Sequence, residues 1–109
     1  MLFPTRTFAS LLLGAASLAG TGAALAQSSA QLHQRATAAT CANCHGTDGR
    51  GVSGAAVPNL AGMPKAQMVA QLKAFRDGTR AATVMHQLAK GLTEQQIESV
   101  ADYFAAIKP

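Results

Sequence analysis

The only two cysteines of the chain, Cys41 and Cys44, are separated by two residues and followed directly by His45. Two thiols and an imidazole at this spacing suit a redox-active disulfide, a zinc site or the covalent attachment of a haem. A redox disulfide needs a low-pKa thiolate at the start of a helix, usually after a strand, and no strand pattern precedes Cys41. Zinc needs four ligands in a tetrahedral arrangement, but His86 is distant in the sequence and His33 is expected at the surface.

The pattern C-x-x-C-H is the attachment signal of c-type haem. Both thiols can add to the haem vinyl groups, while the imidazole of His45 turns towards the iron as the proximal ligand. One helical turn provides this geometry. We therefore predict thioether bonds from Cys41 and Cys44 and one covalent haem c per chain.

The second axial ligand decides the chemistry of the iron. A Met thioether closes the site and favours electron transfer, whereas an open site would bind small ligands or peroxide, as in a haem sensor or a peroxidase. Met85 follows His45 by 40 residues, enough chain to reach the other face of the haem, and is the predicted ligand. Met68 is expected to pack on an apolar helix stripe, while Met63 and His86 remain weaker alternatives.

Residues 1–26 have the features of a secretory signal peptide. Arg6 supplies a positive charge, residues 8–25 form an apolar run, and an Ala-Leu-Ala cleavage site ends at Ala26. Export without a twin-arginine signal and cleavage after about Ala26 would leave residues 27–109 as one periplasmic domain. An uncleaved membrane anchor is the weaker alternative because glycines interrupt the run, and no membrane insertion of the mature chain is expected.

The expected mature domain is small and poor in aromatic residues, with only Phe75, Tyr103 and Phe104. A chain of this length buries too little surface to be stable without a disulfide, a metal or a cofactor. Its eight Lys and Arg residues outnumber five Asp and Glu residues, but the cations are dispersed. We expect no nucleic-acid binding, because no aromatic residues interleave with them, and we expect a redox protein as the partner.

Three helices are predicted around long connections. Alanine-rich residues 31–44 favour a helix that enters the cysteine motif, whereas the glycines of residues 45–63 indicate an irregular loop. A second helix is expected from Pro64, with an apolar stripe and Gly78 beyond its end, followed by a connection over residues 79–91.

The last helix is expected to begin at a capping box formed by Thr93 and Gln96. Its apolar positions recur at helical spacing: Ile97, Val100, Ala101, Phe104 and Ile107. No stretch alternates with the period of a strand, so the fold class is all-α. Loops this long in a small domain are unusual unless they wrap a ligand.

Three segments carry a family resemblance: CANCHGTDGRG, VPNLAGMPKAQMVAQLKAFRDGTR and TVMHQLAKGLTEQQIESVADYFAAI. They resemble a class I c-type cytochrome of the short bacterial type, most similar to the cytochrome subunit of flavocytochrome c sulfide dehydrogenase. In those enzymes a flavoprotein oxidises sulfide and passes electrons to the haem subunit. The resemblance implies an electron-transfer protein that is not itself an enzyme. The alternative is a free-standing diffusible electron carrier to an oxidase or reductase.

The resemblance also implies a cytochrome c fold wrapped around one haem, with the first and last helices crossing and a third along the haem. The carbonyl of Pro58 would accept a hydrogen bond from Nδ1 of His45, and Leu60 would pack on the haem ring. Ala36 and Ala39 would form the small surface on which Tyr103 or Phe104 packs.

Overall fold

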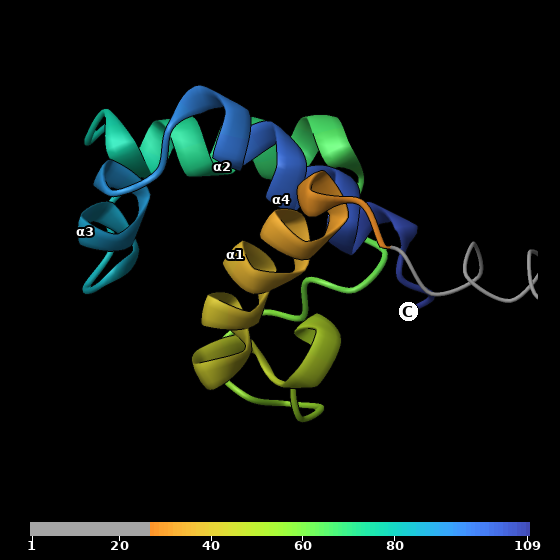
Figure 1. The fold of residues 1–109 in the computed structure, drawn as a ribbon. Helices are drawn as coiled ribbons and strands as arrows, with labels where there is room; N and C mark the ends of the chain where they lie inside the picture. Colours follow the sequence, from red (N-terminus) through yellow and green to blue (C-terminus); the bar gives the residue numbers. More distant parts are fainter. Residues whose placement is uncertain (1–26) are drawn as a thin grey trace, which may run out of the picture.

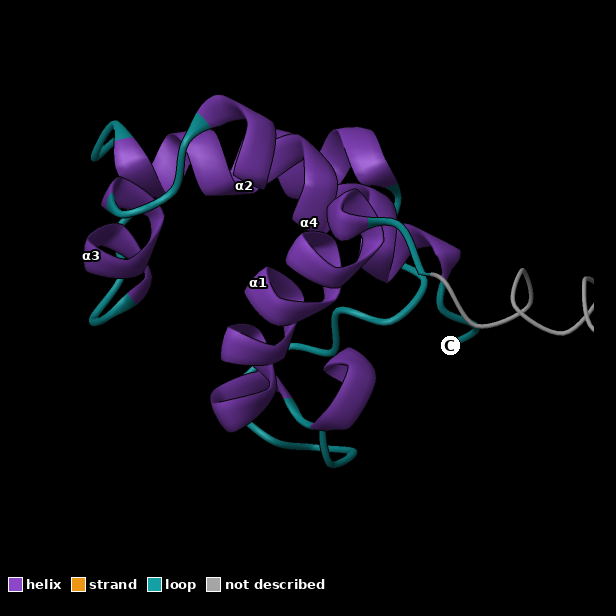
Figure 2. Ribbon diagram, in the orientation of Figure 1, coloured by secondary structure: helices purple, strands orange, loops and turns teal. Residues whose placement is uncertain are grey.

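The computed structural model describes residues 27–109 (Figure 1). They form the helices α1 (Ser29–His45), α2 (Lys65–Arg76), α3 (Met85–Lys90) and α4 (Glu94–Ala106) and the 3-10 turn η1 (Thr47–Gly49). None of these residues forms a strand (Figure 2), and the all-α class is therefore confirmed. The predicted signal peptide, residues 1–26, lies outside the described residues.

Helix α1 begins at a capping box that the sequence analysis did not identify. Gln31 N donates to Ser28 Oγ at 3.3 Å, and Ser28 N donates to Gln31 Oε1 at 3.1 Å, so two backbone donors at the helix start are satisfied. The helix ends at Gly46, which has φ +83°, and a Cβ there would overlap the carbonyl of Arg50. The cysteine motif therefore lies entirely within α1.

One face of α1 contacts α4 and the loop that carries Pro58. Gln34, Ala38, Cys41 and His45 recur at helical spacing on this face. Gln34 Nε2 donates to the carbonyl of Ser99 on α4 at 2.9 Å, and Ala38 is buried in the core that contains Phe104. The contact of the first helix with the last thus continues directly into the cysteine motif.

The prediction that Ala36 and Ala39 form the packing surface of α1 is wrong. Both residues are exposed, whereas Ala38 is only 2% exposed. The alanines of this segment are alike in size, so their sequence does not indicate which one faces α4. The long-range hydrogen bond from Gln34 fixes the rotation of the helix.

The loop after α1 folds back onto α4 through Gly49. Its carbonyl accepts hydrogen bonds from Leu60 N at 2.8 Å and Ala61 N at 3.2 Å. A Cβ at Gly49 would lie 2.8 Å from both the Leu60 Cβ and the ring of Phe104. Only glycine fits, because the space is filled and φ is +73°.

Helix α4 supplies most of the core and packs against both α1 and α2. It begins at the predicted capping box, in which Gln96 N donates to Thr93 Oγ1 at 3.2 Å. Its buried residues are Ile97, Val100, Ala101 and Phe104, and α2 adds Met68 and Leu72. The apolar stripes predicted for these two helices therefore form one core.

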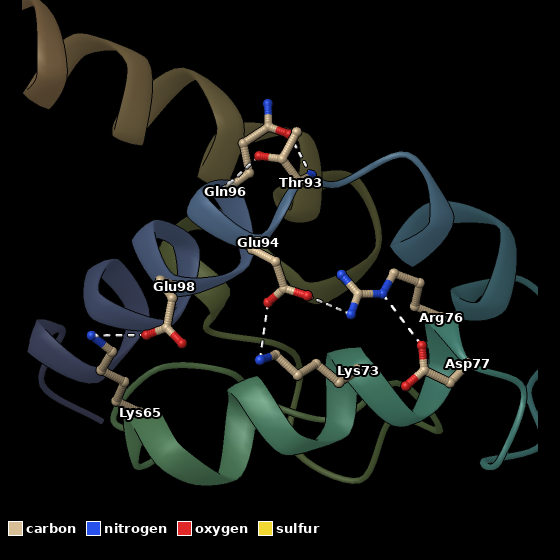
Figure 3. A network of polar contacts seen from close by, with 8 residues as sticks. All are labelled: Lys65, Lys73, Arg76, Asp77, Thr93, Glu94, Gln96 and Glu98. Atoms are coloured by element: carbon tan, nitrogen blue, oxygen red, sulfur yellow. Dashed lines mark hydrogen bonds and ion pairs between the residues drawn. The ribbon is translucent and has the colours of Figure 1, made fainter.

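Ion pairs join α2 and α4 on the outer surface (Figure 3). Glu94 accepts from Lys73 Nζ at 2.9 Å and from Arg76 NH2 at 2.6 Å. Lys65 Nζ lies 3.1 Å from Glu98 and 2.9 Å from Asp102. These side chains are largely exposed, so each single pair contributes little. As a set they align the two helices.

Helix α3 falls within the segment predicted as a connection, residues 79–91, and that part of the prediction is wrong. Met85, Leu88 and Ala89 have the i, i+3, i+4 spacing of a helix, and Gly91 follows its end. Only Ala89 is buried. The helix has six residues, too few for its period to stand out from the sequence alone.

Candidate haem site

A cavity of about 470 Å³ is lined by residues of α1, α2, α3 and the two long loops. Figure 1 shows α3 set apart from α1, with α2 running along the top of both. The lining is mainly apolar and includes every site residue predicted from the sequence: Cys41, Cys44, His45, Pro58, Leu60 and Met85. The volume is in the range of cofactor sites. Folding therefore brings together residues up to 44 positions apart in the chain.

His45 is held in one orientation at the end of α1. The side chain is 7% exposed, and its Nδ1 donates to the carbonyl of Pro58 over 2.7 Å. A carbonyl only accepts hydrogen bonds, so the proton lies on Nδ1 and the lone pair on Nε2. This is the tautomer that binds a metal through Nε2.

The two cysteines are one turn apart on α1 and border the cavity. They form no disulfide with each other; Cys41 is half-buried and Cys44 is exposed. Burial raises the pKa of the Cys41 thiol, and the nearby Cys44 adds to this effect, while a hydrogen bond with Thr40 opposes it. A raised thiol pKa is the reverse of what a redox-active cysteine needs.

The zinc alternative finds no support in the described residues. Among residues 27–109, no three His, Cys, Asp or Glu side chains are grouped so that they could hold a metal ion. A protein zinc site uses three or four such ligands. The cavity instead offers one imidazole and thioethers, a donor set suited to haem iron.

Three methionines line the cavity, and their positions differ. Met68 is 3% exposed and belongs to the hydrophobic core. Met63 lies in the loop that also carries Pro58, the partner of His45. Met85 is half-buried at the start of α3, on a separate element from His45. His86, which follows Met85 in the sequence, does not line the cavity. Of these two adjacent candidate ligands only Met85 borders it.

The described residues fit a haem. Apolar side chains from α2 form one wall, including Leu72 and Phe75, and the two thiols and the oriented imidazole border the same space. Arg80 also lines the cavity and was not predicted from the sequence. No spacing rule could identify it, since it lies in a connection between helices.

A family model described as Cytochrome c matches residues 22–108, and the chain belongs to the cytochrome c family. The cytochrome c4 of Acidithiobacillus ferrooxidans has a similar structure, with a TM-score of 0.63 and 32% identity over 72% of this chain and 49% of that chain. The cytochrome c fold predicted from the sequence is thereby confirmed.

Several relatives are named after thiosulfate dehydrogenase or sulfide dehydrogenase. The thiosulfate dehydrogenase electron acceptor of Thiomonas intermedia is 42% identical over 66% of this chain and 33% of its own length. The cytochrome subunit of sulfide dehydrogenase of Chlorobaculum tepidum is 40% identical over 60% of this chain and 57% of its own length. The chain spans about a third of the first of these relatives and somewhat more than half of the second.

Membership of this family identifies the cofactor and the general activity. Cytochromes c bind haem c covalently and transfer electrons, and they are not enzymes themselves. The predicted cofactor, haem c, is confirmed at this level, and electron transfer is the activity of the family. In the part of the chain that the structure describes, no helix has the length and hydrophobicity required to cross a bilayer.

Proposed function

We propose that this protein is a periplasmic monohaem cytochrome that accepts single electrons as the haem subunit of a sulfide-oxidising flavoenzyme. The observation that carries the proposal is the cavity shared by the Cys41–His45 end of α1 and by Met85 of α3. It combines two thiols for covalent attachment with an imidazole and a thioether for the iron.

Each of these residues has a proposed role. Cys41 and Cys44 would form the thioether bonds, His45 would bind the iron through Nε2, and Met85 would bind it through its sulfur. When bound, the haem supplies an iron that alternates between ferric and ferrous states. With His45 and Met85 bound to the iron in both oxidation states, the site would change little on electron transfer.

Pro58 and Leu60 act through the loop that follows the cysteine motif. The Pro58 carbonyl fixes the His45 tautomer, and the half-buried Leu60 lines the cavity beside Gly49. We propose that Leu60 packs on the haem ring. Iron bound by one thioether and one imidazole favours the ferrous state more than iron bound by two imidazoles. This ligand pair therefore suits an acceptor of electrons.

The proposed donor is a flavoprotein that oxidises sulfide. Support comes from the 40% identity to a cytochrome subunit of sulfide dehydrogenase and from the 42% identity to a thiosulfate dehydrogenase electron acceptor. One name describes a cytochrome subunit of a dehydrogenase and the other an electron acceptor of a dehydrogenase, and both dehydrogenases are named after sulfur compounds. A free diffusible carrier is the second candidate, favoured by the 39% identity to cytochrome c-554(548) of Halomonas halodenitrificans, of which this chain covers 83%.

Gentle purification from the periplasm of the source organism distinguishes these candidates. The proposal predicts haem and flavin in one complex, larger than one chain, whose haem is reduced on addition of sulfide. A complex without flavin that is reduced by thiosulfate would contradict the sulfide assignment. Haem alone at the mass of one chain would identify a free carrier.

The same preparation tests the proposed location and domain boundaries. Removal of residues 1–26 by signal peptidase would give a mature chain that begins at Gln27. The expected result is this N-terminus in the periplasmic fraction. An intact N-terminus in the membrane fraction would support an anchor instead.

A further inference from the structure

Arg80 is the only Lys, Arg, Asp or Glu side chain that lines the cavity within residues 27–109. Two contacts fix its position. Its guanidinium carbon lies 4.5 Å from the ring centroid of Phe75, which also lines the cavity, and its backbone N donates to the carbonyl of Ala74 at 3.0 Å. The guanidinium is therefore held at the cavity wall by the end of α2.

Arg80 has no carboxylate partner in the described part of the chain, although the chain contains five acidic residues. Each of those five pairs with another cation: Asp48 with Arg50, Asp77 with Arg76, Glu94 with Lys73 and Arg76, and Glu98 and Asp102 with Lys65. The cation at the cavity thus remains available for an anion from outside the chain.

The two hydroxyl groups on the α1 wall of the cavity already donate hydrogen bonds to backbone carbonyls of α1. Thr37 Oγ1 donates to the carbonyl of His33 at 2.9 Å, and Thr40 Oγ1 donates to the carbonyl of Thr37 at 2.7 Å. Arg80 carries five N–H groups in a planar fork that matches a carboxylate. It is the strongest anion-binding group that the cavity offers.

A haem brings two propionate carboxylates into this mainly apolar space. A carboxylate at an apolar wall needs a charged hydrogen-bond donor. We infer that Arg80 binds a haem propionate and that this contact raises the reduction potential of the iron. The inference rests on the proposed haem site and assigns an additional residue of the chain to the cofactor.

The direction of the effect follows from electrostatics. A fixed positive charge near the iron, or the neutralisation of a nearby carboxylate, favours the ferrous state, because that state carries one positive charge less. Loss of the charge therefore lowers the potential. Simple packing of Arg80 on Phe75 would stabilise both oxidation states equally and leave the potential unchanged.

The test compares the reduction potentials of the full-length holoprotein and three variants. Arg80→Gln removes the charge, Arg80→Lys keeps it without the planar fork, and Lys90→Gln is the matched control, because Lys90 ends α3 and does not line the cavity. We expect the lowest potential in Arg80→Gln, an intermediate one in Arg80→Lys and a value near that of the wild type in Lys90→Gln. Redox-difference infrared spectra should show a shifted carboxylate band in both Arg80 variants.

A potential for Arg80→Gln equal to that of the Lys90→Gln control would overturn the inference, even if the thermal stability of the variant falls. If Arg80→Gln does not fold, the infrared band of Arg80→Lys decides, and an unshifted band counts against propionate binding. Covalent haem in every variant leaves the proposed function intact in either case. Absence of haem from the wild-type protein would overturn the proposed function itself.

Discussion

Met85 is the residue whose replacement tests the proposed iron ligation. In Met85→Ala the iron loses a thioether ligand, so we expect a lower reduction potential and binding of carbon monoxide to the ferrous protein. Potentiometry and absorption spectroscopy measure both effects. Met63→Ala is the matched control, because Met63 also lines the cavity and is half-buried. If instead Met63→Ala lowers the potential and allows carbon monoxide to bind while Met85→Ala does not, the iron ligand is Met63.

Gly49 tests how the loop is attached to α4. We expect Gly49→Ala to lower the free energy of unfolding by about 1–3 kcal/mol beyond the cost of its left-handed backbone, because the new Cβ meets Leu60 and Phe104. Gly54→Ala is the control, since Gly54 has φ +81° but nothing within 4 Å of an added Cβ. Denaturant unfolding of the two holoprotein variants gives the difference. Equal losses of stability would show that the close contact is unimportant.

At the scale of residues, the predicted site residues border one cavity, whereas the predicted packing surface of α1 is wrong. The C-x-x-C-H pattern predicts roles for Cys41, Cys44 and His45 because covalent attachment requires a fixed local spacing. It did not identify Arg80, whose place at the cavity depends on the path of a loop. Nor does the sequence show that Ala38 is the alanine that faces α4, because the rotation of α1 depends on the long-range hydrogen bond from Gln34 to Ser99.

At the scale of elements, the pairing of α2 with α4 predicts a dependence of stability on pH. Hydrogen bonds from Lys73 and then Arg76 lower the pKa of Glu94 below its ordinary value. Since the folded-state pKa is the lower one, the stabilisation is present above the unfolded pKa and is lost as the pH falls from about 4.5 towards the folded pKa. Glu94 is exposed, so the effect is small.

Comparison of Glu94→Gln with the wild type measures this effect. We expect the variant to be less stable than the wild type near neutral pH and the difference to shrink in acid, as followed by denaturant unfolding. Gln95→Ala, a change at an exposed neutral neighbour on α4, should give a difference that does not depend on pH. A Glu94→Gln difference that stays constant down to acidic pH would show that the ion pairs do not contribute.

The elements found from the sequence are those with strong local signals. The capping box at Thr93 is set by two residues three positions apart, and the apolar stripes of α2 and α4 repeat a helical spacing. Helix α3 has one helical turn of apolar spacing and a single buried residue, Ala89. It is held mainly by its packing beside α2, which a local pattern cannot reveal.

At the scale of the whole molecule, the domain has a small core beside a large cavity. Within residues 27–109 nine hydrophobic residues are buried, and four of them are alanines: Ala38, Ala61, Ala89 and Ala101. Such a core provides little apolar burial for a domain of this length. A haem in the 470 Å³ cavity would add apolar contacts to α1, α2 and α3 at once, which explains why a short chain with few aromatic residues can fold.

The measurement that tests this account most directly is the intact mass of the purified protein under denaturing conditions. A haem attached through thioether bonds to Cys41 and Cys44 would survive denaturation. We predict the mass of residues 27–109 plus one haem. The mass of the polypeptide alone, with two thiols free to react with an alkylating reagent, would contradict the account.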